Sequence, residues 1–220
     1  MKVALGITAA LFVLLLALSR FGGDSTRPAP GLPWDVAVAA DGSTRVFGLV
    51  PGRSRVQDAI DAFGAAPQIA IVGRREDAGS LEAFFDGVDF GGIAGRIVVT
   101  AQAAPDALAA MRARAIKVDY MESATLRATL AEADLAAARA APIRVIAFAP
   151  GAKLDEAIVT TRFGMPDRRL TDTAGATHFL YPARGLDIAI AGNGKALLQY
   201  VAPADFARLT APLDGPAKLQ

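Results

Sequence analysis

Residues 46–52 read VFGLVPG and residues 145–151 read VIAFAPG, so one pattern occurs twice at an offset of 99 positions. Each stretch is a short apolar run that ends in Pro-Gly. Runs rich in β-branched and aromatic residues favour strands, and Pro-Gly favours a turn. A pattern that returns at a fixed offset indicates a repeated structural unit. The pair therefore predicts that a strand turns sharply into the next element twice in this chain.

Three further matches follow these stretches in the same order. Residues 63–67 and 163–166 both begin with Phe-Gly and end in proline, residues 94–99 match 193–198, and residues 104–108 match 202–206. Four matched segments in one order predict a tandem duplication. We therefore expect a first unit over residues 34–116 and a second unit over residues 117–220.

Each unit is expected to contain a short amphipathic helix. In the first unit the apolar residues between Val56 and Phe63 are spaced i, i+3, i+4 and i+7, which places their side chains on one helical face. Residues 154–163 repeat this pattern less regularly. A glycine and then a proline follow each segment, and both residues are typical of the end of a helix.

The rest of each unit is interpreted as an antiparallel meander closed by a short helix. Asn193-Gly194 is the strongest hairpin signal, because this dipeptide fits a two-residue type I′ turn. The expected strands cover residues 34–38, 44–49, 68–72, 81–85, 88–93 and 96–102, then 123–130, 143–149, 168–171, 178–181, 186–191 and 195–201. The expected helices cover residues 53–63, 105–115, 131–140, 154–163 and 203–209. The predicted fold class is α+β, with helices segregated from an antiparallel sheet.

The order of Pro-Gly, short helix, Gly-x-Pro or Gly-x-x-Pro, and strands with an aromatic–apolar pair resembles the SmpA/OmlA (BamE-like) module over most of residues 45–209. Two such modules in tandem are similar to the layout of the β-lactamase-inhibitor-protein fold. Proteins with this module are typically outer-membrane lipoproteins, whereas this chain has no cysteine to carry the lipid. That departure argues against a role in outer-membrane barrel assembly. The whole chain also resembles a family of bacterial membrane-anchored proteins, which implies no particular activity.

The N-terminus has the layout of a secretory signal or membrane anchor. Lys2 precedes an uncharged run over residues 3–18, which Arg20 closes, and residues 22–33 are rich in Pro and Gly, as in a linker. As a helix the run would be roughly 24–29 Å long, near the lower limit for crossing a bilayer. The layout favours an uncleaved signal anchor over residues 1–21, with one transmembrane helix in the inner membrane and the remaining chain in the periplasm. The alternatives are a cleaved signal, which leaves a soluble periplasmic protein, and a buried core helix.

The composition excludes several classes of function. The chain has 23 Lys+Arg and 22 Asp+Glu, and this near-balance argues against the basic surface that nucleic-acid binding requires. The absence of cysteine excludes disulfides, thiolate nucleophiles and Cys-based metal sites, and a single histidine excludes multi-histidine motifs. The glycine-rich stretches 91–95 and 192–196 lack the spacing and context of dinucleotide and phosphate loops. We therefore expect no cofactor and no metal ion.

His178 is the one candidate for catalysis in a hydrolase, with Asp172 or Asp187 to orient the ring. The competing interpretation places His178 on the solvent face of a strand, where it alternates with Phe179. The chain contains no Gly-x-Ser-x-Gly elbow to supply a nucleophile. These observations favour a protein without a catalytic site.

Other charged residues have ordinary structural explanations. Asp86 and Asp89 form the best carboxylate pair for Ca²⁺ or for acid–base work, but Asp86-Gly87 also has the chemistry of a hairpin turn. Asp58 and Asp61 are expected on the solvent face of a helix. The turn and surface interpretations are preferred for both pairs.

A set of aromatic side chains is the best candidate for a partner-binding surface. Neighbouring side chains of a strand point to opposite faces, so Phe84 and Phe85 cannot both enter one core. The set consists of Phe84, Phe85, Phe90, Phe179, Tyr181 and Tyr200. We expect a non-catalytic module that binds or scaffolds another cell-envelope protein. The alternatives are a hydrolase that uses His178, and a carrier of a small ligand or peptide between the two units.

Overall fold

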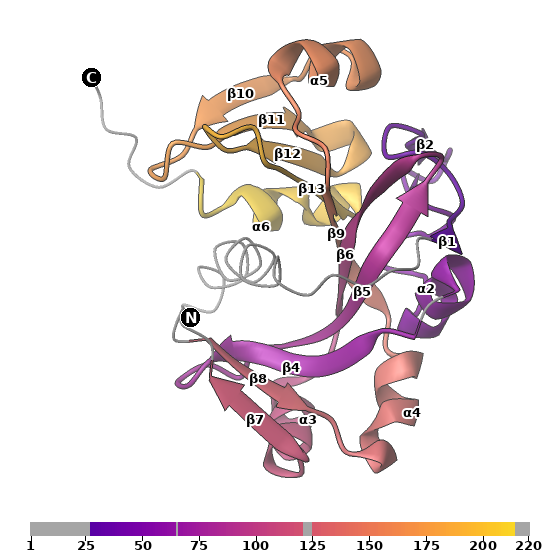
Figure 1. Ribbon diagram of the computed structural model, residues 1–220, viewed down its shortest axis with the longest axis vertical. Helices are drawn as coiled ribbons and strands as arrows, with labels where there is room; N and C mark the ends of the chain where they lie inside the picture. Colours follow the sequence, from indigo (N-terminus) through magenta and orange to yellow (C-terminus); the bar gives the residue numbers. More distant parts are fainter. Residues whose placement is uncertain (1–26, 65, 121–124, 214–220) are drawn as a thin grey trace.

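The computed structural model describes residues 27–64, 66–120 and 125–213, and within them a single large sheet dominates the fold (Figure 1). Its strands are β1 (Arg27–Pro28), β4 (Gln68–Arg74), β5 (Ser80–Phe90), β6 (Ile93–Ala101), β7 (Lys117–Tyr120), β8 (Thr125–Thr129), β9 (Ile143–Pro150), β10 (Arg168–Thr171), β11 (Thr177–Tyr181), β12 (Leu186–Ile190) and β13 (Ala196–Val201). They follow the spatial order β10-β11-β12-β13-β9-β6-β5-β4-β8-β7. Every neighbouring pair is antiparallel except β1, which lies parallel to β5.

Short helices and one small hairpin accompany the sheet. The hairpin pairs β2 (Ala37–Val38) with β3 (Thr44–Arg45). The helices are α2 (Val56–Phe63), α3 (Pro105–Ala113), α4 (Glu132–Ala140), α5 (Glu156–Phe163) and α6 (Phe206–Thr210), with 3-10 turns η2 (Pro182–Arg184) and η3 (Pro203–Asp205). Each of the five α-helices found in the described residues overlaps a segment that the sequence predicts as a helix.

The predicted fold class, an N-terminal transmembrane helix followed by two separate helix-plus-sheet modules, is wrong. β9 bonds to β6 on one side and to β13 on the other, so strands of both predicted units form one continuous sheet. β8, from the second predicted unit, pairs with β4 of the first. The predicted anchor over residues 1–21 lies outside the described residues. Within the described part of the chain, no helix is both long enough and apolar enough to cross a membrane.

The two matched stretches that suggested the duplication adopt different structures. Residues 145–151 lie almost entirely in β9 at the centre of the sheet. In the first stretch, by contrast, Val46 and Leu49 exchange backbone hydrogen bonds of 2.9 and 2.8 Å around a tight turn. Gly48 adopts φ 77° in that turn, a conformation that L-residues adopt only with strain, and alanine stands at the matching position 147. The strand expected over residues 44–49 is therefore limited to β3.

The turn predicted at Asp86-Gly87 is also wrong. β5 continues through these residues with a shift of register between Phe85 and Val88. Gly87 has φ 68°, which allows the extra residue of a β-bulge to be accommodated without ending the strand. The chain reverses instead after Phe90, so one long strand replaces the two short strands expected over residues 81–85 and 88–93.

The two faces of the sheet are covered differently. One face, which we call the aromatic face, packs against α2, α3, α4 and α5 through one continuous core whose rings include Phe47, Phe63, Phe85, Phe90 and Phe148. The other face, which we call the opposite face, carries three small apolar clusters, and α6 contributes Phe206 and Leu209 to one of them. Figure 1 shows α2 and α4 on one side of β6 and β9 and α6 on the other.

Candidate functional site

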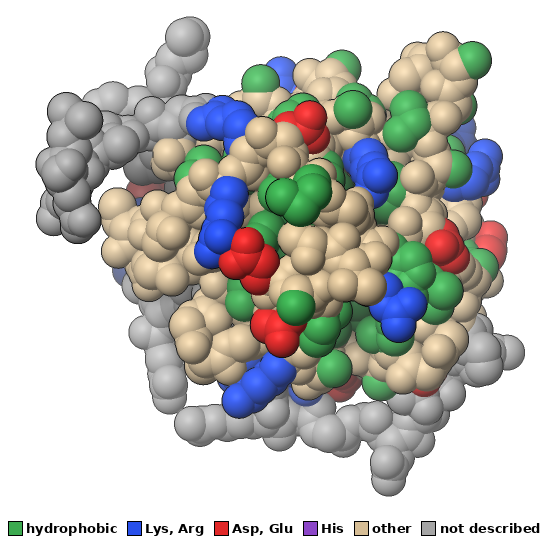
Figure 2. Space-filling model, turned by 90° about the horizontal axis from the view of Figure 1, so that it is seen from above, with side chains coloured by type: hydrophobic (Ala, Val, Ile, Leu, Met, Phe, Trp, Pro, Cys, Tyr) green, Lys and Arg blue, Asp and Glu red, His purple; other side chains and the backbone are tan. Residues whose placement is uncertain are grey.

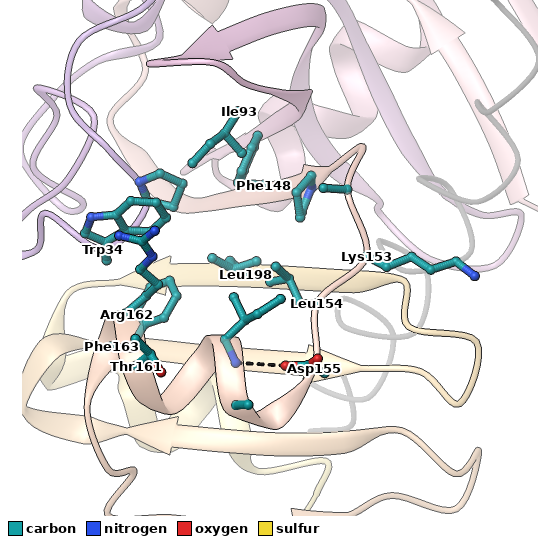
Figure 3. Close-up of a pocket in the computed structure, with 15 residues that line it drawn as sticks. Trp34, Ile93, Phe148, Lys153, Leu154, Asp155, Thr161, Arg162, Phe163 and Leu198 are labelled. Carbon is teal, nitrogen blue, oxygen red and sulfur yellow. Dashed lines mark hydrogen bonds between the residues drawn. The ribbon is translucent and has the colours of Figure 1, made fainter.

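A cleft of about 550 Å³ lies beside α5 and is lined by residues from distant parts of the chain. Trp34 and Ile93 come from the first half of the sequence, and Phe148, Leu154 and Phe163 come from the second. Figure 3 shows Ile93 and Phe148 across the space from Leu154, with Trp34 at one end. The cleft therefore forms only when β9 and α5 fold back beside the turn between β5 and β6.

Hydrogen bonds fix both walls of the cleft. The hydroxyl of the buried Tyr200 donates to the carbonyl oxygen of Pro33 at 2.7 Å, which holds the segment that carries Trp34 against the sheet. Burial raises the pKa of Tyr200 well above its usual range, so this hydroxyl remains a donor. On the other wall, the carboxylate of Asp155 accepts a hydrogen bond from the Ile158 amide at 2.8 Å and caps α5. Both walls are thus held in place by hydrogen bonds made by residues that line the cleft.

The cleft is apolar with one positive group at its rim. The guanidinium of Arg162 lies 4.7 Å from the centre of the Trp34 ring, and the Phe163 ring meets Trp34 edge-on at 6.3 Å. Lys153 points away from the cavity in Figure 3. Ile158 is 39 % exposed although it occupies an apolar position of α5. The cleft therefore combines an aromatic anchor, partly exposed aliphatic surface and one delocalised cation.

This chemistry suits binding better than reaction. The carboxylate of Asp155 is engaged by its own helix, and Arg162 is a poor acid or base because it stays charged. Among the described residues that line the cleft there is no histidine or buried carboxylate to activate a nucleophile. The arrangement can hold an apolar group and pair with a nearby anion.

His178 does not lie on a solvent face, so the preferred interpretation of this residue is wrong. The side chain is 5 % exposed, and its Nδ1 lies 2.9 Å from a carboxylate oxygen of Asp187. Its Nε2 lies 3.5 Å from the carboxylate of Asp172. Burial lowers the pKa of His178, but the hydrogen bonds and charges of Asp187 and Asp172 outweigh burial and raise it overall. Both aspartates that the sequence suggested as orienting groups thus contact the ring.

The His178 cluster is closed on both sides of the imidazole. In the described part of the chain no hydroxyl or amine bonds to either ring nitrogen. Asp172 also accepts hydrogen bonds from the backbone amides of Ala174 and Ala176, which close the turn before β11. Burial raises the pKa of Asp187, although His178 opposes this shift. The geometry is that of a buried ion-pair cluster that joins β11, β12 and the preceding turn.

The other candidate residues lie in separate places. Asp86 pairs with Arg96 at 3.1 Å on the opposite face, whereas Asp89 accepts a hydrogen bond from the Gly92 amide at 2.6 Å in the turn after β5. These two carboxylates therefore do not form one site. Residues 192–196 include the turn between β12 and β13, so the predicted hairpin is present. The predicted type I′ geometry is wrong, because Gly194 has a positive φ but Asn193 does not. Within the described residues, no group of three potential metal ligands comes together.

The predicted aromatic surface is mostly core. Phe85, Phe90, Phe179, Tyr181 and Tyr200 are each at most 3 % exposed and belong to the core of the aromatic face. Phe84 alone is half-buried, and it packs on the opposite face. The alternation of side chains along a strand does separate Phe84 from Phe85, as the sequence requires. As a set, however, these six side chains do not form an exposed surface.

Sequence reasoning missed the residues that do line the cleft. Trp34 is the single tryptophan of the chain, which is a signal that could have singled it out. Ile158 and Arg162 follow the helical pattern of residues 154–163, but periodicity does not reveal which part of an apolar stripe stays uncovered. The cleft depends on contacts between segments far apart in sequence.

The face of the molecule shown in Figure 2 has positive and negative side chains interspersed rather than gathered by sign.

No family model matches this chain, and neither a curated protein nor a solved structure matches it significantly. The candidate site is therefore defined by its own geometry: an apolar cleft beside α5 with Trp34 at one end and Arg162 at the rim.

Proposed function

We propose that this protein is a non-catalytic binding module that holds an apolar segment of a partner protein in the cleft beside α5. The observation that carries the proposal is the combination of Trp34, the partly exposed Ile158 and the walls fixed by Tyr200 and Asp155. Preformed apolar pockets with an aromatic anchor are typical of the centres of protein interfaces. The uncharged run over residues 3–18 supports a place of action in the bacterial cell envelope, on its periplasmic side.

The charge at the rim suggests what the partner carries. Arg162 stacks on Trp34, and its guanidinium edge remains available for a carboxylate because the side chain is exposed. The proposed ligand is therefore a peptide segment with a bulky apolar side chain and an acidic residue near it.

One observation favours the alternative of a hydrolase, namely the contact between His178 and Asp187. A catalytic dyad would need a nucleophile or a water molecule at Nε2, and this nitrogen faces Asp172 at 3.5 Å. We therefore infer a structural role for this cluster and assign the function to the cleft.

Trp34 allows the proposal to be tested directly, because its emission is the only tryptophan signal of the protein. We expect peptides that contain phenylalanine or leucine beside aspartate to shift the Trp34 emission to the blue in a saturable way. Ile158→Asp should weaken this binding at least about 10-fold, because it places a charge in the apolar wall.

The matched control is Ile116→Asp, since Ile116 is 71 % exposed and lies outside the cleft. This variant should bind like the unmodified protein, and circular dichroism should show that both variants keep their structure. The proposal fails if no peptide of this composition gives a saturable change, or if the two variants bind equally.

A further inference from the structure

A second cavity of about 450 Å³ lies on the opposite face, between α6 and the start of α3. Its larger apolar lining residues come from α3, β9, β13 and α6 and include Leu108, Val145, Val201 and Leu209. It shares no lining residue with the cleft beside α5. The two cavities are thus separate sites on one molecule.

A buried hydroxyl without a partner lies in the wall of this cavity. Thr100 is 3 % exposed, and its Oγ1 makes no hydrogen bond. Directly across the β5–β6 ladder, Glu82 is also buried, and its Oε2 has no hydrogen-bond partner. Buried polar atoms without partners destabilise a fold and call for an explanation, and an absent ligand is one. Thr100 belongs to the lining of the cavity, so its unpartnered hydroxyl lies next to a space that can hold a ligand.

A half-buried arginine lies in the same wall. Thr100 stands opposite Val145 in the β6–β9 ladder and Ala101 stands opposite Ile143, so Arg144 is the extra residue of a β-bulge. Bulges of this kind redirect a side chain, and here Arg144 lines the cavity. In the described part of the chain its guanidinium has neither an ion pair nor a hydrogen bond. An unpaired cation in a mostly apolar cavity attracts an anion.

The remaining charges near the cavity leave this cation unopposed. Arg208 pairs with Asp205 at 2.7 Å, so these two lining groups neutralise each other. Burial raises the pKa of Glu82 to about 7, although the Ser80 hydroxyl opposes the shift, and Glu82 itself does not line the cavity. The net charge presented by the lining is therefore positive.

We propose that this cavity binds an amphipathic monocarboxylate, a molecule with one carboxylate and a hydrocarbon chain. The carboxylate would pair with Arg144 and accept a hydrogen bond from the Thr100 hydroxyl. The chain would pack among Leu108, Val145 and Leu209, which supply the apolar surface. This site is independent of the proposed peptide-binding cleft, because the two linings have no residue in common.

Calorimetric titration of the full-length protein with octanoate tests the proposal, because octanoate stays monomeric at the concentrations needed. We expect one octanoate to bind per chain. Octyltrimethylammonium, with a hydrocarbon chain of similar length and the opposite charge, should bind at least about 10-fold more weakly. Arg144→Gln should weaken octanoate binding about 10-fold to 100-fold, the range for losing a hydrogen bond to a charged group.

Thr100→Val gives an independent readout, since it removes only the unpartnered hydroxyl. Octanoate binding should weaken about 2-fold to 10-fold, whereas the thermal midpoint should stay the same or rise. Arg139→Gln, at an exposed position of α4 outside both cavities, controls for the loss of one positive charge. It should bind octanoate like the unmodified protein.

Three results would overturn the assignment. The first is octyltrimethylammonium binding as tightly as octanoate, which would remove the role of charge. The second is unchanged octanoate affinity in Arg144→Gln or Thr100→Val. The third is loss of octanoate binding in Ile158→Asp, which would place the ligand in the cleft beside α5 instead. That last outcome leaves the peptide-binding proposal standing, so the two proposals can fail separately.

Discussion

The two faces of the sheet both carry buried side chains, but the kinds of side chain differ. On the aromatic face, the Phe47 ring lies 4.1 Å from Phe90 and 5.7 Å from Phe148, and these rings continue into one core. On the opposite face, three small clusters alternate with polar side chains, and buried atoms of Glu82, Thr100 and Gln199 have no partner. A continuous aromatic core maximises the burial of apolar surface. Unpartnered polar atoms lower stability, so the opposite face carries features that stability alone does not explain.

Burial alone does not separate structural from functional positions in this sheet. Phe85 and Glu82 belong to the same strand, and both are at most 6 % exposed. The Phe85 ring meets the Phe63 ring edge-on, with 5.1 Å between ring centres, whereas one carboxylate oxygen of Glu82 makes no hydrogen bond. Whether a buried polar atom has a hydrogen-bond partner is therefore a better guide than burial to where a ligand can bind.

The largest expected effect separates two neighbouring phenylalanines of β5. Phe85→Ala should lower the free energy of unfolding by roughly 3–5 kcal/mol, because it leaves a cavity in the aromatic core. Phe84→Ala should cost roughly 1–2 kcal/mol, because Phe84 is only half-buried on the opposite face. Denaturant unfolding of both variants measures the difference. Equal losses would show that the two faces contribute alike to stability.

The next effect concerns Glu82, whose pKa of about 7 in the folded protein compares with 4.5 for an ordinary glutamate. A carboxyl with a raised folded pKa lowers stability as pH rises between these two values, because the folded state retains the proton that the unfolded state has lost. Glu82→Gln should therefore stabilise the protein by up to about 3 kcal/mol at pH 8 and change little at pH 4.

Asp86→Asn is the matched control, because Asp86 lies on the same strand and face but pairs with Arg96. It should give no gain at pH 8. Denaturant unfolding at both pH values makes the comparison, and a Glu82→Gln gain that is equal at pH 4 and pH 8 would contradict the prediction.

The smallest effect concerns His178. Because it is the single histidine of the sequence, its titration can be followed by NMR without overlap from another imidazole. We expect its pKa in the folded protein to lie above the usual 6.5, because Asp187 and Asp172 flank the ring. The cluster's contribution to stability is then complete below pH 6.5 and is lost as pH rises through the folded pKa. Asp172→Asn should lower the pKa of His178. A folded pKa at or below 6.5 would contradict this assignment.

Local structure was largely predictable from the sequence. The helical spacing between Val56 and Phe63 and the glycines at positions 64 and 164 predicted α2 and α5 together with their ends. Asn193-Gly194 predicted the hairpin between β12 and β13. These elements depend on side chains within a few positions of one another, which is why the linear pattern is enough.

The pairing of distant strands was not predictable in the same way. The matched stretches 46–52 and 145–151 share their apolar pattern, yet only the second enters the sheet. The turn at the first stretch requires Gly48 in a left-handed conformation and a buried site for Phe47. The cleft and the second cavity depend in the same way on segments that are far apart in sequence. Pattern matching does not report such long-range contacts.

The amino-acid sequence was enough to exclude disulfides, Cys-based metal sites and multi-histidine motifs. It was also enough to locate the helices and most strand segments, and to place Phe84 and Phe85 on opposite faces of a strand. Those properties follow from residue type and from the periods of helix and strand. Tertiary structure alone decided that the strands form one sheet, that His178 lies between two carboxylates, and that Trp34 and α5 enclose a cleft. These features depend on which segments, far apart in sequence, pack against one another. Many sequences with the same local pattern could pack these segments in a different arrangement.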